Sequence, residues 1–245
     1  MKKWYKTWFS SDEYLNVYNH RDSQDAENII NLILTQIPLP QNAVILDAAC
    51  GAGRHAIILS KLGYKVIAFD LSTNLLKIGL NNSAEHQENI HFFCSDIRRT
   101  FIKKKVDLIT NLFTSFGYFE NDDENFIFFH NSKSLLKKDG FVVFDYFNSN
   151  HVKNNLIENS ERVINSKRII EERRIEDNFV IKKIVIEENG NNSEFYERVK
   201  LYDFEFLIKK FSEIGFTIEK SFGNYNGAEF NQNKSKRMVL FLKNG

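Results

Sequence analysis

Residues 44–55 read Val-Ile-Leu-Asp-Ala-Ala-Cys-Gly-Ala-Gly-Arg-His, and they join an apolar run to a glycine-spaced turn. The run over 44–46 predicts a short buried strand, and apolar residues over 56–62 recur at helical spacing. The turn therefore connects a strand to a helix. Gly51 and Gly53 lack a Cβ, so a ligand can lie directly on the backbone, where the free N–H groups of the helix start point outward.

A second apolar run, 66–69, ends at Asp70, whose carboxylate is placed to bind both hydroxyls of a ribose. Together with the glycine turn it predicts an adenosine pocket. The run from Gly51 to Ala56 also fits the loose dinucleotide pattern, in which an acid follows about 20 residues later, so NAD fits as well. Asp47 distinguishes the two cofactors, because a carboxylate there disfavours a pyrophosphate but suits an ammonium group. The residues therefore favour S-adenosylmethionine over NAD.

The chain from Val44 to Ser72 resembles the first two motifs of class I S-adenosylmethionine-dependent methyltransferases. Within that family it is most similar to small-molecule N-methyltransferases of the glycine and amino-sugar kind. Later stretches resemble further landmarks of the family: Ser95-Asp96-Ile97, the loop 111–119 after a fourth apolar strand, and the turn and strand 139–145. In that turn Asp139 replaces the first of two usual glycines. The resemblance covers most of residues 42–149 and 203–243.

The resemblance implies an α/β fold, namely a doubly wound, Rossmann-like, seven-stranded sheet whose last hairpin is antiparallel. Apolar strands at 216–218 and 238–242 fit that hairpin, and they follow a helix that Asp203 can cap. Another helix is predicted over 123–138. We expect three parts: an N-terminal helical lid (1–41), a methyltransferase core (42–149 and 203–245) and a small antiparallel β insert (150–202).

The cofactor contacts also follow from the resemblance. Asp70 would hold the ribose, Asp96 would face the adenine amino group, and Arg21 would bind the methionine carboxylate. The full set of cofactor-binding residues that the resemblance implies is Arg21, Asp47, Ala49, Gly51, Gly53, Asp70, Leu71, Asp96, Ile97 and Leu112. No metal ligands are expected, because the histidines and cysteines do not have the paired spacing of a zinc site.

Aromatic rings crowd the N-terminal segment: Trp4, Tyr5, Trp8, Phe9, Tyr14 and Tyr18. Either these rings pack against the sheet, or their faces attract the cationic sulfonium by about 0.5–2 kcal/mol. The residues that can help an amine lose its proton are Tyr14, Tyr18, His20 and Tyr118. Tyr118 is the first choice, because related N-methyltransferases carry a polar ring after strand four. The alternative is that Tyr118 packs beside Phe116 and Phe119.

Residues 150–202 lie outside the resemblance, and their alternating charged and apolar residues predict an antiparallel meander. Turn signals at 176–178 and 189–191 divide it into three strands, the last over 195–202. Two roles stay open for it. In the first, it only covers one face of the core. In the second, it roofs the substrate pocket or pairs two subunits as a homodimer, and related amino-sugar enzymes use this insertion point in that second way.

Global composition fits one compact enzyme: 245 residues carry 33 Lys and Arg against 32 Asp and Glu. That balance gives no broad attraction for a phosphate backbone, so we expect no nucleic-acid partner. The basic clusters Lys103–Lys105 and Arg173-Arg174 are expected on solvated surfaces. With no secretory segment or membrane span in the sequence, a cytoplasmic protein is expected, with Cys50 and Cys94 as free, packed thiols.

The sequence therefore predicts methyl transfer from S-adenosylmethionine to a small-molecule acceptor, an amine nitrogen, by in-line displacement. The alternatives are an RNA- or protein-modifying methyltransferase, and an NAD-dependent oxidoreductase or cofactor-binding module built on the same loop. The identity of the acceptor, the choice between N and O methylation, and the oligomeric state are left open by the sequence.

Overall fold

The computed structural model describes residues 3–18, 23–86, 89–99 and 102–245. Its main sheet has seven strands in the order β10-β11-β5-β4-β1-β2-β3. The strands are β1 (Val44–Ala48), β2 (Lys65–Asp70), β3 (Ile90–Cys94), β4 (Val106–Asn111), β5 (Leu136–Phe147), β10 (Phe216–Phe222) and β11 (Arg237–Asn244). Strands β1 to β5 pair in parallel, whereas β11 pairs antiparallel with both β5 and β10. The predicted seven-stranded fold with an antiparallel last hairpin is confirmed.

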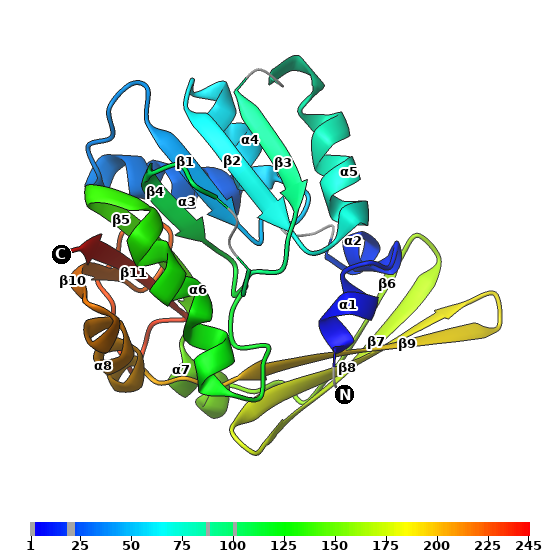
Figure 1. Ribbon diagram of the computed structural model, residues 1–245. Coiled ribbons are helices and arrows are strands. Elements are labelled where there is room, and N and C mark those ends of the chain that lie inside the picture. The colour runs from blue at the N-terminus through cyan, green and yellow to red at the C-terminus, as the bar shows by residue number, and fades with distance from the viewer. Residues whose placement is uncertain (1–2, 19–22, 87–88, 100–101) are drawn as a thin grey trace.

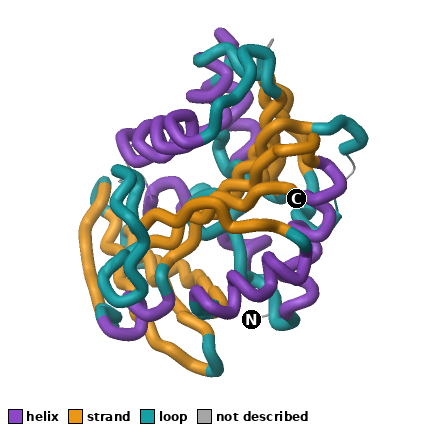
Figure 2. Tube along the Cα trace, turned by 90° about the vertical axis from the view of Figure 1, so that its left-hand side faces the viewer, coloured by secondary structure: helices purple, strands orange, loops and turns teal. Residues whose placement is uncertain are grey.

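Helices cover both faces of this sheet (Figures 1 and 2). They are α3 (Ser23–Gln36), α4 (Arg54–Lys61), α5 (Thr73–Asn82), α6 (Asp122–Leu135) and α8 (Phe204–Ile214), with a short 3₁₀ turn at Ala84–His86. Side chains of β1 alternate between the two layers: Val44 and Leu46 pack in the cluster with α6 and α8, and Ile45 packs with α3 and α4. Because both faces are covered, β1 is buried along its whole length.

The predicted ends of α8 and α6 can be compared with the ends of these helices in the structure. Helix α8 begins as predicted, because the Asp203 carboxylate accepts from the backbone N–H of Phe206 (2.8 Å), and it ends at Gly215 in the left-handed conformation. The prediction for α6 is wrong at its end: the helix stops at Leu135 rather than Lys138. Leu136 is buried and already pairs with Val106 in the sheet, so tertiary packing overrides the helical propensity of the following lysines.

The segment between β5 and α8 contains a helix, α7 (Ser149–Asn154), and a second antiparallel sheet. This sheet has four strands rather than the predicted three: β6 (Asn159–Ile164), β7 (Lys167–Glu176), β8 (Phe179–Glu188) and β9 (Asn191–Lys200). The turn at Asn165-Ser166 was missed, and no residue of β6 is fully buried, so its apolar signal is weak. The last strand is also longer at its start than predicted and ends before Tyr202. Both predicted turns are present.

The N-terminal segment packs on the four-stranded sheet. Its helices α1 (Trp4–Trp8) and α2 (Glu13–Tyr18) lie between that sheet and the carboxyl ends of the main strands (Figure 1). Trp8 and Tyr18 are buried together with Ile184 and Ile186 of β8. Within the described part of the chain, no helix is long and apolar enough to cross a membrane.

Candidate active site

A cavity of about 1320 Å³ lies where the carboxyl ends of the parallel strands face the N-terminal segment and the four-stranded sheet. Three residues of its floor come from these strand ends. Ala49 directly follows β1, Asp70 is the last residue of β2, and Leu112 directly follows β4. In open α/β sheets, ligands bind at these strand ends, where the strand order reverses between β1 and β4. The volume exceeds the roughly 300–1,000 Å³ of common single-ligand sites, so two ligands fit side by side.

The two glycines of the turn have different roles in the structure. Gly51 lines the cavity at φ +58°, and a Cβ built on it meets nothing within 4 Å. Gly53 has φ +73°, but its Cβ would come within 2.6 Å of Phe92 Cζ, behind the turn. Gly51 therefore leaves open room for a ligand on the backbone, whereas Gly53 allows the turn to pack against β3. Ala49 also lines the cavity and adopts a positive φ of 56°.

Asp70 lies at the end of β2 and is nearly buried, with 8% of its surface exposed. One carboxylate oxygen accepts from the Gly51 N–H (2.9 Å), and the other accepts from the Ser72 N–H (2.8 Å). Burial raises the pKa of the carboxyl group, and these backbone donors oppose that rise. Asp70 thus lines the cavity and also holds the glycine turn in place.

Asp47 presents a buried carboxylate at the base of the cavity. Its Oδ1 accepts from the Thr110 hydroxyl (2.8 Å), and among the described residues its Oδ2 has no hydrogen-bond partner. The pKa of Asp47 is raised to about 7, because the effect of burial outweighs the opposing effect of the Thr110 hydrogen bond. A buried carboxylate oxygen without a partner is costly, so a ligand cation at this position would stabilise it. This arrangement fits the ammonium group of S-adenosylmethionine.

Asp96 lines the cavity, but its carboxylate is already held by Arg98. The Arg98 Nε donates to Oδ1 (3.0 Å) and Nη2 donates to Oδ2 (2.6 Å), and this pairing lowers the pKa of Asp96. The same guanidinium also pairs with Glu124 and stacks over the Phe119 ring. Arg98 was not among the predicted residues. The predicted apolar contacts Leu71, Ile97 and Leu112 all line the cavity.

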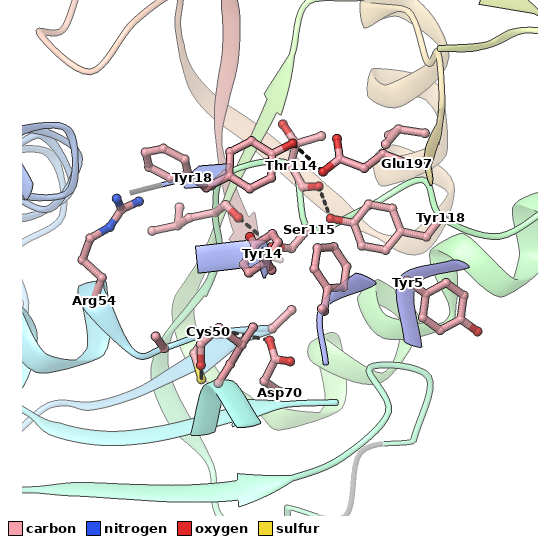
Figure 3. Close-up of a pocket in the computed structure, with 18 of the residues that line it drawn as sticks. Tyr5, Tyr14, Tyr18, Cys50, Arg54, Asp70, Thr114, Ser115, Tyr118 and Glu197 are labelled. Atoms are coloured by element: carbon pink, nitrogen blue, oxygen red, sulfur yellow. Dashed lines mark hydrogen bonds between the residues drawn. The ribbon is translucent and has the colours of Figure 1, made fainter. Parts of the chain in front are cut away.

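The opposite end of the cavity is aromatic and polar (Figure 3). Tyr14, Tyr18 and Tyr118 all line it. The Tyr118 hydroxyl donates to the Thr114 carbonyl (2.7 Å), and its ring lies 5.1 Å from the Trp4 ring, so it packs against the N-terminal aromatic residues. The remaining predicted residues, His20 and Arg21, lie outside the described part of the chain.

Comparisons with known proteins identify the fold around this cavity. Residues 45–140 match a family model described as a methyltransferase domain. The chain carries an S-adenosylmethionine-dependent methyltransferase domain. It is 34% identical over 101 residues to a putative methyltransferase of Geobacillus sp. (strain WCH70), and the aligned residues cover 41% of each chain. It is 28% identical over 106 residues to the glycine/sarcosine N-methyltransferase of Aphanothece halophytica, covering 42% of this chain and 40% of that one. The chain thus aligns with less than half of the length of these curated relatives.

Solved structures share the fold over most of the length of this chain. An S-adenosylmethionine-dependent methyltransferase from Clostridium acetobutylicum superposes with a TM-score of 0.80 over 91% of this chain and 92% of its own, at 22% identity. An amino pentose methyltransferase from Micromonospora echinaspora, solved with S-adenosylmethionine bound, gives a TM-score of 0.68 over 94% and 97%, at 15% identity. At these identities the likeness concerns the fold.

The residues that sequence reasoning missed come mainly from the four-stranded sheet. Glu197 lines the cavity and accepts from the Trp8 indole (2.8 Å) and the Tyr18 hydroxyl (2.5 Å), while Lys182 pairs with it at 2.9 Å. Arg173, expected on a solvated surface, lines the cavity and pairs with Glu171 instead. The charged residues of these strands alternate with apolar ones, but the sequence does not say which face turns inward.

The two cysteines differ in environment. Cys50 is buried beside the cavity, and burial raises the pKa of its thiol well above the usual value. The prediction of a packed thiol is wrong for Cys94, which is exposed at the end of the edge strand β3. Within the residues that the structure describes, no three His, Cys, Asp or Glu side chains group in a way that could hold a metal ion.

Proposed function

We propose that the protein transfers a methyl group from S-adenosylmethionine to an amine nitrogen of a small-molecule acceptor. The observation that carries this proposal is the single continuous cavity, which has the glycine turn and three carboxylates at one end and tyrosines with Glu197 at the other. The first end suits an adenosine with an ammonium group. The second end suits a small cationic molecule, because a carboxylate and aromatic faces both attract cations.

In this proposal the predicted cofactor residues each contact a different part of the cofactor. Gly51 and Ala49 give the backbone surface, Asp70 binds the ribose, and Asp47 receives the ammonium group. Asp96 contributes near the adenine through the pair that it forms with Arg98. Leu71, Ile97 and Leu112 form apolar walls. Arg21 keeps its proposed role at the methionine carboxylate.

Bound S-adenosylmethionine supplies an activated methyl group for in-line displacement by the acceptor nitrogen. The protein's own contribution is to hold the acceptor in line and to exclude water, since correct placement is worth about 7–11 kcal/mol. The Tyr118 hydroxyl, fixed by its hydrogen bond to Thr114, orients the acceptor, and Tyr14, Tyr18 and His20 are the other proposed catalytic residues. Glu197, which pairs with Lys182, attracts the ammonium form of the amine, and the amine passes its proton to water before its nitrogen attacks the methyl group.

We also propose that the part spanning residues 150–202 acts as a roof over the acceptor and that residues 1–41 act as a lid. Several contacts support this. The sheet contributes Val180, Lys182 and Glu197 to the cavity, and the lid is tied to it by the Trp8 and Tyr18 hydrogen bonds. The outer side of the roof, where Val163 is exposed, is the proposed contact for a homodimer.

Cofactor affinity should depend on pH through Asp47. Because its pKa is raised to about 7, Asp47 keeps a proton in the folded protein between about pH 4 and pH 7, whereas the unfolded chain has released it. The free energy of unfolding therefore falls as pH rises through this range. Ligand binding has the opposite trend, since only the ionised carboxylate attracts an ammonium group. We expect affinity for S-adenosylhomocysteine to rise about 10-fold between pH 6 and pH 8. Calorimetric titration should show this slope, and Asp47→Asn should flatten it; an equal slope in that variant would remove Asp47 from this role.

The proposed function is tested in two steps. Calorimetric titration with S-adenosylhomocysteine, S-adenosylmethionine and NAD should show micromolar binding of the first two only, and binding of NAD alone would contradict the cofactor. Matched pairs of acceptors that differ only in an amine or a hydroxyl group are then incubated with S-adenosylmethionine, and products are detected by mass spectrometry. We expect methylation of amines. Methylation of the hydroxyl partners alone would contradict the proposed nitrogen acceptor.

The matched control for the acceptor step uses two glutamates of β9. We expect Glu197→Gln, in the cavity, to raise the KM for the amine about 10-fold, the loss of one charge-assisted contact. Glu194→Gln lies on the same strand and removes an ion pair with Lys183 outside the cavity, so its KM should stay at the wild-type value.

A further inference from the structure

The loop after β4 holds two consecutive residues in the left-handed region of backbone conformation. Phe113 has a φ of 56° and Thr114 has a φ of 63°. This region is disfavoured for L-residues, and a β-branched residue such as threonine is a marked outlier there. Both residues line the cavity. Backbone strain of this kind persists only where surrounding contacts impose it, and it gathers at functional sites.

A single residue of β5, Asp145, binds both strained amides. Its carboxylate Oδ2 accepts from the Phe113 N–H (2.8 Å), and its main-chain oxygen accepts from the Thr114 N–H (3.0 Å). Asp145 itself is fully buried and does not line the cavity. It therefore acts on the cavity through the loop.

The Asp145 carboxylate is in turn fixed by two residues from the last hairpin. Arg237 in β11 donates from Nε to Oδ1 (2.8 Å), with Nη2 of the same guanidinium at 2.7 Å, and the Tyr225 hydroxyl donates to Oδ2 (2.9 Å). The Phe113 ring is held from two sides, 5.3 Å from the His55 ring and 5.5 Å from the Tyr225 ring. The loop is thus restrained at its amides and at its side chain by separate elements.

The Thr114 side chain shows that the conformation is not locally favourable. Its hydroxyl oxygen is buried and, among the residues that the structure describes, has no hydrogen-bond partner. A buried hydroxyl without a partner adds to the cost of the left-handed backbone. The contacts of Asp145 are what offset both costs.

We propose that Asp145 is a positioning residue that holds Phe113 and Thr114 in the left-handed conformation needed for cofactor binding, which rests on the methyltransferase function proposed above. The network of Arg237, Asp145 and Tyr225 forms a clamp on this loop, in which Arg237 reaches the cavity while Asp145 and Tyr225 lie behind its lining. It gives the loop one geometry before any ligand arrives, so that less ordering is needed when the ligand binds.

Amide hydrogen exchange tests the clamp without any ligand. Asp145→Asn keeps the side-chain shape but removes its charge, and we expect exchange at the Phe113 and Thr114 amides to become about 10-fold faster. Tyr225→Phe removes one donor from the same oxygen and leaves the Arg237 pair intact, so a smaller increase of about 3-fold is expected, and this variant serves if Asp145→Asn does not fold. Tyr202→Phe is the matched control, because its hydroxyl donates to Asp122 (2.5 Å) outside the cavity. Wild-type exchange in both clamp variants would overturn the proposal.

Affinity for S-adenosylhomocysteine separates positioning from a purely structural role. Asp145→Asn should bind this ligand about 3- to 10-fold more weakly. Glycine adopts positive φ without steric cost. The double variant Asp145→Asn with Thr114→Gly should therefore bind S-adenosylhomocysteine with an affinity within about 2-fold of that of Thr114→Gly alone. A loss that glycine does not relieve, or no loss at all, would contradict the proposal. If the wild-type protein binds no S-adenosylhomocysteine, the proposed function fails, and the exchange measurement still decides on the clamp.

Discussion

Gly51→Val should weaken the binding of S-adenosylhomocysteine by at least roughly 100-fold, and it should also lower the stability of the fold. The added side chain occupies the space where a ligand approaches the backbone, since the protein itself leaves that direction empty for at least 4 Å. A β-branched residue at φ +58° also costs about 1–2 kcal/mol in backbone strain. Calorimetric titration measures the affinity, and thermal unfolding measures the strain.

Gly190→Val is a close control for this variant. Gly190 also has a positive φ, +81°, and a Cβ there meets nothing within 4 Å. It lies in the turn between β8 and β9, outside the cavity. Both variants should therefore lose similar stability, and only Gly51→Val should lose the ligand. Cofactor binding by a folded Gly51→Val protein would show that the ligand does not lie on this turn.

Asp70→Ala is the second change with a large expected effect, because one carboxylate serves both the ligand and the turn. Loss of a charged hydrogen bond to the ribose costs about 1.5–3 kcal/mol, which weakens S-adenosylhomocysteine binding roughly 10- to 150-fold. The variant also leaves the amides of Gly51 and Ser72 without their acceptor, so the turn loses its geometry. Titration calorimetry and thermal unfolding together measure the two losses.

The control for this change is Asp107→Ala at the amino end of the same sheet. The Asp107 carboxylate also accepts from a backbone N–H, that of Val44 (2.8 Å), and it lies outside the cavity. It should lower stability with no change in ligand affinity. If Asp70→Ala binds S-adenosylhomocysteine as the wild type does, the ribose assignment is wrong, whatever happens to stability.

Local signals predicted much of the fold and part of the candidate site. The strand, glycine turn and helix from Val44 to Lys61 follow from hydrophobic periodicity and glycine placement, and the Asp203 cap follows from side-chain chemistry three residues away. Such features depend on neighbours in the chain. The glycine turn also predicted where the carboxylates of Asp47 and Asp70 would meet, because strand ends in a parallel sheet lie at one edge.

Other features of the site depend on contacts between distant segments, which the sequence alone does not reveal. The end of α6 is set by pairing of Leu136 with β4, and the fourth strand of the insert was hidden by the polar sequence of β6. The contact of Glu197 with Trp8 joins residues 189 positions apart in the chain. Hydrophobic pattern gives the period of a strand but not the partner of each charge.

The sequence by itself determined the class of fold and the carboxylates at the base of the cavity, because strand ends and a glycine turn are encoded within short stretches. Only the tertiary structure decided which face of the insert turns inward, and so placed Glu197 in the cavity. It alone gave Gly51 and Gly53 different roles, and it alone joined Asp145 to the strained loop at Phe113. Each of these contacts joins residues that are brought together by packing, which optimises the whole core at once rather than any single segment.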